Sequence, residues 1–472
     1  MKEALAKEFV TLLENSIEIT GDKVKLLKPD TAKKYARKLA EISALEKGPR
    51  AGAARYITRC IAQQMGIVPA SIHELYMARG TGEVKPTFTV PAINLRVQTF
   101  DCASAVFRAA KKMDAASILF EIARSEMVYT DQRPSEYTTS VLAAAIAEGY
   151  KGPVFLQGDH FQVKPKAYAT DPNKEIESLK TLMVEAIAAG WFNIDVDTST
   201  LVDLEKKTIP EQQAVNVGLS SMFTKFLRDT QPAGVTISVG GEIGEVGGHN
   251  STVEELRGYL EGYKAALAKL DPKAVGLSKI SIQTGTSHGG VVLPDGSIAK
   301  VNVDFNCLKE LGAEARKYGL GGAVQHGAST LPEDAFGHFV QYEGLEIHLA
   351  TNFMNIWYDH IPASLKDEMY KYLRENNAAD RKPDMTDEQF YYKTRKSAVG
   401  PFKKQSWNLP ENVRAEIGKA WEDQFTKLFT LLGLKGTSEI VAKTVHAKVI
   451  DPVEKDYFVG EAAAEDVTGM AD

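Results

Sequence analysis

The chain contains few cysteines and no long apolar run, and both absences exclude whole classes of protein. Its 472 residues include only Cys60, Cys102 and Cys307, whose spacing fits neither a disulfide framework nor a zinc motif. No apolar segment approaches the roughly 20 residues that a membrane-spanning helix needs. The first segment carries glutamates through an amphipathic pattern, unlike a signal peptide. We therefore expect a cytoplasmic protein that does not bind a membrane.

A basic surface patch is also missing. The formal net charge is -6, and no sustained cluster of lysine and arginine occurs along the chain. Proteins that bind nucleic acid need a basic face to displace counterions, so we expect no nucleic-acid partner. The hydrophobic fraction of 44% and the charged fraction of 25% are typical of an ordinary globular protein.

The character of the sequence changes twice. Residues 1–85 are rich in charged residues and alanine with helical periodicity, which predicts a helical N-terminal extension. Residues 86–362 alternate short apolar runs with longer amphipathic segments, as in a parallel sheet with crossover helices. Residues 363–472 return to a helical pattern and end in an acidic tail. We predict a central domain between two helical regions.

The central domain contains eight strand-like runs. They are TFTVPAINL from Thr87, SILFEI from Ser117, GPVFLQGDH from Gly152, FNIDVDTS from Phe192, GVTISVGGEIG from Gly234, KISIQTGTSH from Lys279, GAVQHGAS from Gly322 and GLEIHLATN from Gly344. Eight βα units over about 280 residues match the usual size of a (β/α)8 TIM barrel. A doubly wound sheet is the alternative, but it seldom supplies eight units with such uniform ends.

Acidic and imidazole side chains recur where these runs end. The third run ends in Asp159 and His160, the fifth in Glu242, the sixth in His288 and the seventh in His326. Active sites of such barrels lie at the carboxyl ends of the strands. Neighbours on an extended strand point to opposite faces, so Asp159 and His160 should not both be buried in one core. At a strand end, however, both can reach a common ligand.

Three histidines from separate strand ends predict a metal site. The chain has only nine histidines, which makes this coincidence hard to explain as core filling. Three neutral imidazoles with an open fourth position are a catalytic zinc arrangement. His160, His288 and His326 are therefore the predicted ligands, with Asp159 beside the metal as the proton carrier.

Glycines flank the same strand ends. Gly289 follows His288, Gly327 follows His326, and Gly247 and Gly248 come shortly after Glu242. A glycine lets backbone N–H groups approach an anion closely, which suits a phosphate, although turn geometry alone also selects glycine. In HGASTLPEDAF, the hydroxyl residues after Gly327 suit either a helix N-cap or an anion site.

These motifs resemble those of class II, metal-dependent fructose- and tagatose-bisphosphate aldolases, from Pro86 to about His360. VPAINL, GDH, GEIGEVGG, SHGG and QHGAS carry the resemblance. It implies proton transfer by Asp159 and metal binding by His160, His288 and His326. Glu242 falls where a glutamate of the family can contact a second metal position, and we also take it as catalytic. The substrate and phosphate contacts that it implies are Asn94, Gly289, Gly327, Ser329 and Thr351. The metal, Zn²⁺ or another divalent ion such as Co²⁺ or Mn²⁺, stabilises an enediolate in that family.

Three departures from the family pattern are present. Where the family has acidic residues on a mobile loop, this chain has His249, which we predict to be catalytic. Where the family's eighth strand has a substrate-binding asparagine, this chain has His348, a predicted substrate contact. The second strand carries Glu121 and Ala123 in place of a glutamine and a serine. These features resemble the companion subunit of tagatose-bisphosphate aldolase, a group that includes sugar-phosphate C4 epimerases.

The resemblance leaves three functions open. The first is an aldolase that cleaves the C3–C4 bond of a ketose (bis)phosphate. The second is an epimerase that inverts C4 of a ketose or ketose phosphate by the same retro-aldol chemistry. The third is a non-catalytic partner subunit, which would have no use for three converging imidazoles. We expect a small-molecule sugar or sugar phosphate as the substrate, and a homo-oligomer.

Overall fold

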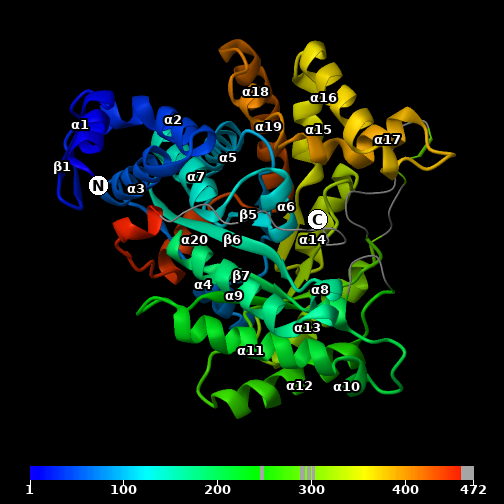
Figure 1. Ribbon diagram of the computed structural model, residues 1–472. Coiled ribbons are helices and arrows are strands. Elements are labelled where there is room, and N and C mark those ends of the chain that lie inside the picture. The colour runs from blue at the N-terminus through cyan, green and yellow to red at the C-terminus, as the bar shows by residue number, and fades with distance from the viewer. Residues whose placement is uncertain (245–248, 287–292, 295–298, 300–302, 459–472) are drawn as a thin grey trace.

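A computed structural model describes residues 1–244, 249–286, 293–294, 299 and 303–458. Within these ranges, no helix has both the length and the apolar character required to span a bilayer. Eight parallel strands close into a barrel at the centre of the molecule (Figure 1). The strands are β4 (Val90–Asn94), β5 (Leu119–Ala123), β6 (Gly152–Gln162), β7 (Asn193–Asp197), β8 (Ser238–Glu242), β9 (Lys279–Ile282), β10 (Ala323–Gln325) and β11 (Glu346–Leu349).

The barrel closes because β11 pairs with β4, and β6 pairs with both β5 and β7. The predicted (β/α)8 barrel is confirmed. Six strands fall within the runs that predicted them, and β5 and β6 extend past the ends of theirs to Ala123 and Gln162. In register, Asn94 lies beside Glu121, and Ala123 lies beside Asp159. The pairing therefore brings the polar ends of β4, β5 and β6 to one rim of the barrel.

Amphipathic helices follow the strands and cover the outside of the barrel. They are α5 (Thr99–Met113), α6 (Arg124–Tyr129), α7 (Pro134–Glu148), α8 (Pro165–Thr170), α9 (Pro172–Ala188), α10 (Ile209–Gln212), α11 (Ala214–Thr230), α12 (Val253–Leu270), α13 (Phe305–Lys317), α14 (Phe336–Gln341) and α15 (Thr351–His360), with short 3-10 turns η1 (Ser199–Leu201) and η2 (Glu333–Ala335). Their apolar faces pack on strands that are buried along their whole length, such as β4 and β5.

The N-terminal extension is mainly helical but also contains strands. Its elements are α1 (Glu3–Leu12), β1 (Ile17–Thr20), β2 (Lys23–Leu26), α2 (Pro29–Leu45), α3 (Gly48–Gln64), β3 (Ile67–Pro69) and α4 (His73–Thr81). β1 and β2 form a hairpin around the two-residue turn Gly21-Asp22, in which Gly21 has a φ of +63°. β3 adds to the start of β6 by parallel pairing of Ile67 with Gly152 and Pro69 with Val154. The extension is thus joined to the barrel sheet.

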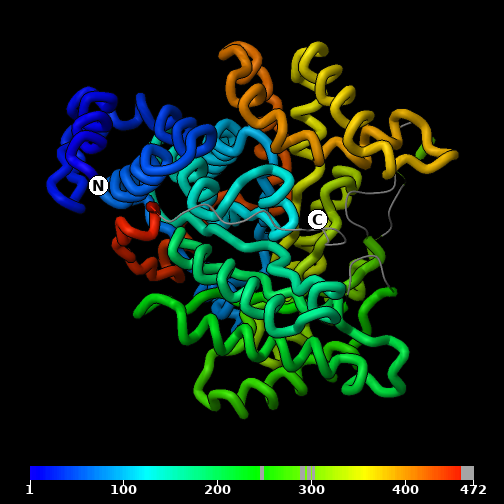
Figure 2. Tube along the Cα trace, viewed as in Figure 1, coloured from blue at the N-terminus to red at the C-terminus, as the bar shows by residue number. Residues whose placement is uncertain are grey.

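The C-terminal region packs against two sides of the barrel. It comprises α16 (Ala363–Asn376), η3 (Ala378–Asp380), α17 (Asp387–Thr394), η4 (Arg395–Ala398), α18 (Lys403–Trp407), α19 (Glu411–Leu431), α20 (Thr437–Thr444) and η5 (Glu454–Tyr457). In α19, Trp421, Phe425 and Phe429 recur every fourth residue and are fully buried. One helix face is therefore apolar, and it packs beside α5 and α15. The segment around η5 returns to α3, where red lies beside blue in Figure 2.

Candidate active site

The third barrel strand places two adjacent polar residues in the same interior region. The pairing of β6 with β7 shifts register between Gly158 and Phe161, and His160 has a φ of +37°. A bulge of this kind redirects side chains at the end of a strand. Asp159 and His160 are consequently both buried, at 3% and 2% exposure. The expectation that alternation would prevent this is wrong because the strand does not alternate there.

His160, His326 and Glu242 form a group suited to a divalent cation. Candidate ligand atoms of the three residues lie within 4.8 Å of one another. Nε2 of His160 lies 2.8 Å from Nδ1 of His326, and Nδ1 of His160 lies 3.5 Å from Oε2 of Glu242. Imidazole nitrogen and carboxylate oxygen are both ligands that zinc and related ions accept. The strand ends of β6, β8 and β10 are thus brought together as the sequence predicts.

Asp197, at the end of β7, positions the imidazole of His160. Its Oδ2 lies 3.2 Å from Nδ1 of His160, and its Oδ1 accepts a hydrogen bond of 2.7 Å from Oγ of Ser199. A metal-binding histidine commonly donates its second ring N–H to a carboxylate in this way. The sequence analysis missed Asp197. The signal was present in FNIDVDTS, where two acids separated by one residue share a face of the strand.

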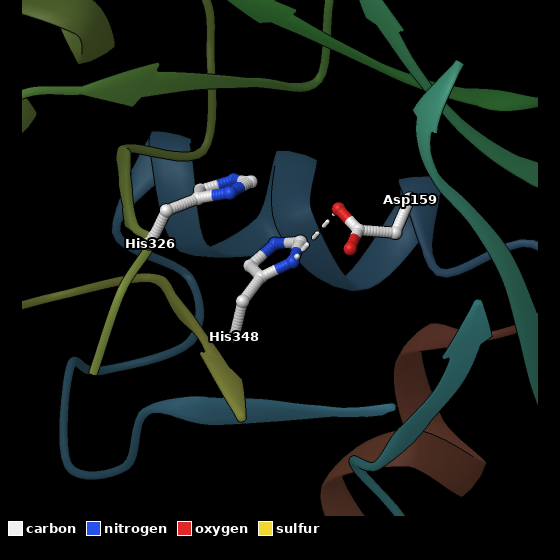
Figure 3. Close-up of side chains that lie close together, drawn as sticks. All are labelled: Asp159, His326 and His348. Carbon is white, nitrogen blue, oxygen red and sulfur yellow. Dashed lines mark ion pairs between the residues drawn. The ribbon is translucent and has the colours of Figure 1, made fainter. Parts of the chain in front are cut away.

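His348 and Asp159 face each other across the barrel mouth, as Figure 3 shows. Nδ1 of His348 lies 3.3 Å from Oδ1 of Asp159 and 3.0 Å from Oε1 of Glu121. The imidazole of His348 also stacks on that of His326, with ring centroids 3.9 Å apart. Nδ2 of Asn94 donates a 3.2 Å hydrogen bond to Oδ2 of Asp159. Asp159 therefore contacts both Asn94 and His348, the predicted substrate contacts, and His348 also packs against His326, a candidate metal ligand.

The barrel mouth favours positive charge. Burial raises the pKa of Glu121 to about 7, and Asp159 adds to this rise. Burial also raises the pKa of Glu242 to about 7. Burial opposes charge on His160 and His348, but neighbouring carboxylates, including Asp159, raise the pKa of both imidazoles well above the usual value. A divalent cation would satisfy the same negative field, so the residues present fit a metal.

A second polar layer lies beneath the mouth, inside the barrel. Nζ of Lys279 is buried 3.0 Å from Oδ2 of Asp195 and 2.8 Å from Oε1 of Gln157, and it also pairs with Glu346. Oε1 of Glu346 in turn lies 2.7 Å from Nε2 of His348. The sequence analysis missed this layer because the runs were interpreted as apolar. The charged residues in FNIDVDTS, KISIQTG and GLEIHLA were its signal.

A cavity of about 530 Å³ lies at the barrel mouth and is shared with the C-terminal region. Its barrel side includes Asn94, Arg96, Glu121, Asp159, His326 and His348. Oδ1 of Asn94 is buried and has no hydrogen-bond partner among the described residues, so it is available to a ligand. The C-terminal residues on the cavity include Lys382, Asp384, Lys393, Arg395 and Lys396. The sequence analysis assigned none of these five to the site, because no motif marks them.

The predicted anion contacts Gly327, Ser329 and Thr351 also line this cavity. Gly327 has a φ of +68°, which the sharp turn after β10 requires. Oγ of Ser329 accepts a 2.5 Å hydrogen bond from the backbone N–H of Ala350. Thr351 begins α15, whose N-terminal end therefore faces the cavity and favours an anion.

Among the described residues, one predicted site residue lies apart from the others, and two further predicted site residues are not described. His249 is exposed, and its Nε2 lies 2.8 Å from Oε1 of Glu255 in the first turn of α12. It is not among the residues that line the cavity. His288 and Gly289 lie outside the described residues. The predicted roles of these three residues stay predictions.

Comparison with known families gives one match, which spans the whole barrel. Residues 84–405 match the family model described as Fructose-bisphosphate aldolase class-II. No curated protein matches the chain.

Solved structures share the fold at low sequence identity. The fructuronate-tagaturonate epimerase UxaE from Cohnella laeviribosi, in a crystal structure with glycerol, has a TM-score of 0.54 and 13% identity, covering 89% of this chain and 90% of its own. A "probable tagatose 6 phosphate kinase" from Sinorhizobium meliloti 1021 has a TM-score of 0.50 and 16% identity, covering 78% and 99%. Fructose-bisphosphate aldolase (Fba) from Campylobacter jejuni has a TM-score of 0.45 and 16% identity, covering 79% and 96%.

Proposed function

Because the chain belongs to the class-II fructose-bisphosphate aldolase family, we propose that it is a metal-dependent lyase acting on a ketose (bis)phosphate such as fructose 1,6-bisphosphate. It would cleave and form the C3–C4 bond of that substrate. One observation carries the proposal: Asp159, His160, His326 and Glu242 are buried together at the mouth of the barrel. This arrangement provides a proton acceptor beside a group of candidate metal ligands.

The metal ligands proposed are His160, His326, Glu242 and His288. A divalent cation bound there, zinc or alternatively cobalt or manganese, would supply Lewis-acid polarisation of the ketose oxygens and offset the negative charge of the enediolate. The raised pKa values of the imidazoles support this assignment because the surrounding carboxylates favour a cation.

Asp159 is proposed to carry the proton in the cleavage step. Its carboxylate takes the proton of the C4 hydroxyl, the C4–O bond becomes a carbonyl, and the C3–C4 electron pair passes to the C2 carbonyl as an enediolate. Asn94 and His348 lie 3.2 and 3.3 Å from the Asp159 carboxylate, so both can orient a substrate hydroxyl against it. Gly327, Ser329 and Thr351 would hold a phosphate beside the N-terminal end of α15.

Epimerisation at C4 is the second candidate. It uses the same bond cleavage, followed by recombination on the other face of the aldehyde. The observation in its favour is that C-terminal residues of the same chain line the cavity at the barrel mouth, which would help to retain an aldehyde between the two steps. One protein of similar fold is named an epimerase of two uronates. The third candidate, a non-catalytic partner subunit, requires no bound metal.

One experiment separates these candidates. Metal content of the purified protein is measured first, and ketoses, ketose phosphates and ketose bisphosphates labelled at C4 are then incubated with it. Free labelled aldehyde identifies an aldolase, and inversion at C4 without free aldehyde identifies an epimerase. Full absence of metal and turnover would contradict both enzymatic functions. Protein treated with a chelator is the matched control.

A further inference from the structure

A tyrosine of the N-terminal extension reaches the interior of the barrel. Tyr76 lies in α4 and is fully buried. Its hydroxyl donates a hydrogen bond to Oε2 of Glu346, the first residue of β11. The match to the aldolase family begins at residue 84, so Tyr76 belongs to a part of the chain that the family model does not include. The extension therefore contributes a side chain to the polar layer beneath the barrel mouth.

Helix α4 is fixed to the amino ends of the barrel strands. The backbone N–H of Ile72, just before the helix, donates a 2.8 Å hydrogen bond to Oδ1 of Asn193, the first residue of β7. A Cβ atom on Gly321, just before β10, would lie 2.8 Å from the backbone oxygen of Tyr76, so this close approach requires glycine. The backbone of Tyr76 is thus held in place against two separate strands.

The two carboxylate oxygens of Glu346 have different partners. Oε1 accepts a 3.1 Å hydrogen bond from Nε2 of Gln157, pairs with Lys279, and lies 2.7 Å from Nε2 of His348. Among the described residues, the hydroxyl of Tyr76 is the only hydrogen-bond partner of Oε2. Without that hydroxyl, Oε2 is a buried acceptor that lacks a donor. The carboxylate is then expected to turn toward Lys279 and away from His348.

The charge states of these groups set the direction of each hydrogen bond. Burial raises the pKa of Tyr76 well above its usual value, so the hydroxyl keeps its proton and acts as a donor. Burial opposes charge on Glu346, but the Lys279 ammonium outweighs burial and holds the pKa of that carboxyl below its usual range. An ionised carboxylate only accepts hydrogen bonds, so the Nε2–H group of His348 is the donor to Oε1. Glu346 therefore fixes one ring nitrogen of His348.

The other ring nitrogen of His348 faces the proposed proton carrier. Nδ1 of His348 lies 3.3 Å from Oδ1 of Asp159, and Figure 3 shows the two side chains pointing toward each other. An unbroken series of contacts thus leads from α4, at the amino ends of the strands, to the carboxylate at the barrel mouth. A change at Tyr76 can alter the orientation of Asp159 without any direct contact between the two residues.

We propose that Tyr76 is a positioning residue of the active site, which acts through Glu346 to hold the imidazole of His348 in place. The imidazole in turn orients the carboxylate of Asp159. The inference rests on the proposed function, because it takes Asp159 as the group that carries the proton. A small displacement of a proton acceptor lowers turnover even when its cause lies far from the reacting atoms. The N-terminal extension is then part of the catalytic apparatus as well as of the fold.

Nuclear magnetic resonance tests this positioning without turnover. In full-length protein with isotope-labelled histidine, the buried Nε2–H proton of His348 should give a downfield resonance that exchanges slowly with solvent. Its loss in His348→Asn assigns the resonance. We expect Tyr76→Phe to shift it upfield and to accelerate its exchange, because the hydrogen bond to Glu346 weakens when the carboxylate turns away.

Steady-state kinetics of the metal-loaded protein tests the effect on the reaction. The substrate is fructose 1,6-bisphosphate, or whichever ketose of the set labelled at C4 is turned over. Tyr76→Phe should lower kcat about 10-fold with a smaller change in KM, because alignment of the proton acceptor matters more for the reaction than for binding. In a Glu346→Gln background the same substitution should have no further effect, since Glu346 is the route of the coupling.

Tyr263→Phe is the matched control. It also removes one buried hydroxyl, which donates a 2.9 Å hydrogen bond to Oγ1 of Thr224. This bond joins α12 to α11 in the helical layer outside the barrel. The control variant should keep the kcat and the His348 resonance of the unmodified protein.

The outcomes separate the positioning role from the proposed function. An unchanged resonance or an unchanged kcat in Tyr76→Phe would overturn the positioning role, as would an equal loss of kcat in Tyr263→Phe. If Tyr76→Phe does not fold, the resonance and kcat of Glu346→Gln decide, and unchanged values overturn the proposal. If the unmodified protein turns over no ketose, the proposed function fails, and a shifted resonance in Tyr76→Phe still supports the orientation of His348 by Tyr76.

Discussion

Nδ1 of His160 lies 3.2 Å from Oδ2 of Asp197, and this contact directs the other ring nitrogen of His160 toward His326. Asp197 also accepts a 2.6 Å hydrogen bond from Nε2 of Gln162. The carboxylate is therefore held by several partners and cannot rotate away from the imidazole without losing them. A candidate metal ligand is oriented by a residue that need not touch the metal.

We predict that Asp197→Asn weakens metal binding by about 10- to 100-fold, since the imidazole loses its charged partner. Metal affinity is measured by competition with a chromophoric chelator. Asp203→Asn, which changes a half-buried carboxylate on the connection after β7, is the control and should bind metal normally. Equal affinity in both variants would mean that Asp197 does not position the ligand.

Asp159→Asn should retain the metal but lose about 10²–10⁴-fold in kcat, because asparagine preserves the shape and removes the basic oxygen. Metal content and turnover are measured on the same preparation. Normal turnover would move the proton-transfer role to another carboxylate, with Glu242 or Glu121 as the next candidates.

The affinity for anionic ligands should decrease as the pH rises through about 8. Burial, together with the nearby Arg96, lowers the pKa of Lys396 to about 8, so the lysine loses its charge above this pH. Lys396→Arg remains charged and should keep its affinity at pH 9. The check is the pH dependence of glycerol 3-phosphate binding in both proteins, and identical profiles would contradict the prediction.

Lys279→Met should destabilise the protein by about 3–5 kcal/mol at pH 7, because it leaves Asp195 and Glu346 buried without their cation. Burial already raises the pKa of Asp195 to about 6, so protonation should reduce this loss at pH 5. The loss in the free energy of unfolding is measured by denaturant unfolding at pH 7 and at pH 5. Lys269→Met, at an exposed position of α12, is the control and should change the free energy of unfolding little. A loss of similar size in both variants would argue against the buried network.

His249→Ala tests the predicted role of the loop histidine. If His249 delivers a proton to the enediolate, the variant should exchange the C3 proton of dihydroxyacetone phosphate with solvent deuterium more slowly, at unchanged metal content. In the structure His249 contacts Glu255, so this role requires the imidazole to leave that carboxylate. Fast exchange in both proteins would reject the role.

The fold could be predicted because strand periodicity and polar strand ends are local signals. The runs that end in Asp159, Glu242 and His326 all became barrel strands or their carboxyl ends. The bulge at His160 could not be predicted, because it depends on the register between β6 and β7. A positive φ at a histidine has no marker in the sequence.

The rest of the site depends on contacts between distant segments. Arg395 reaches the cavity because the segment from Lys382 to Lys396 folds back over the barrel mouth. In the sequence, KTRKSA resembles any charged helix end. Lys279 lies in an apolar run and acquires its role from Asp195 and Glu346 on other strands. Such pairs arise from tertiary packing and leave no spacing pattern that one sequence reveals.

Because β3 pairs with β6, the N-terminal extension and the barrel share one sheet, although the sequence changes character near Pro86. Ile67 and Pro69 pair with the first residues of β6, the strand that ends in the candidate site, and they lie some ninety residues before Asp159 in the sequence. A shortened chain starting at Pro86 would bare the backbone of Gly152–Val154 as an open edge, and open edges recruit other strands. The extension therefore stabilises the first residues of the strand that contains Asp159 and His160. An engineered protein that fuses this barrel to other segments should retain β3.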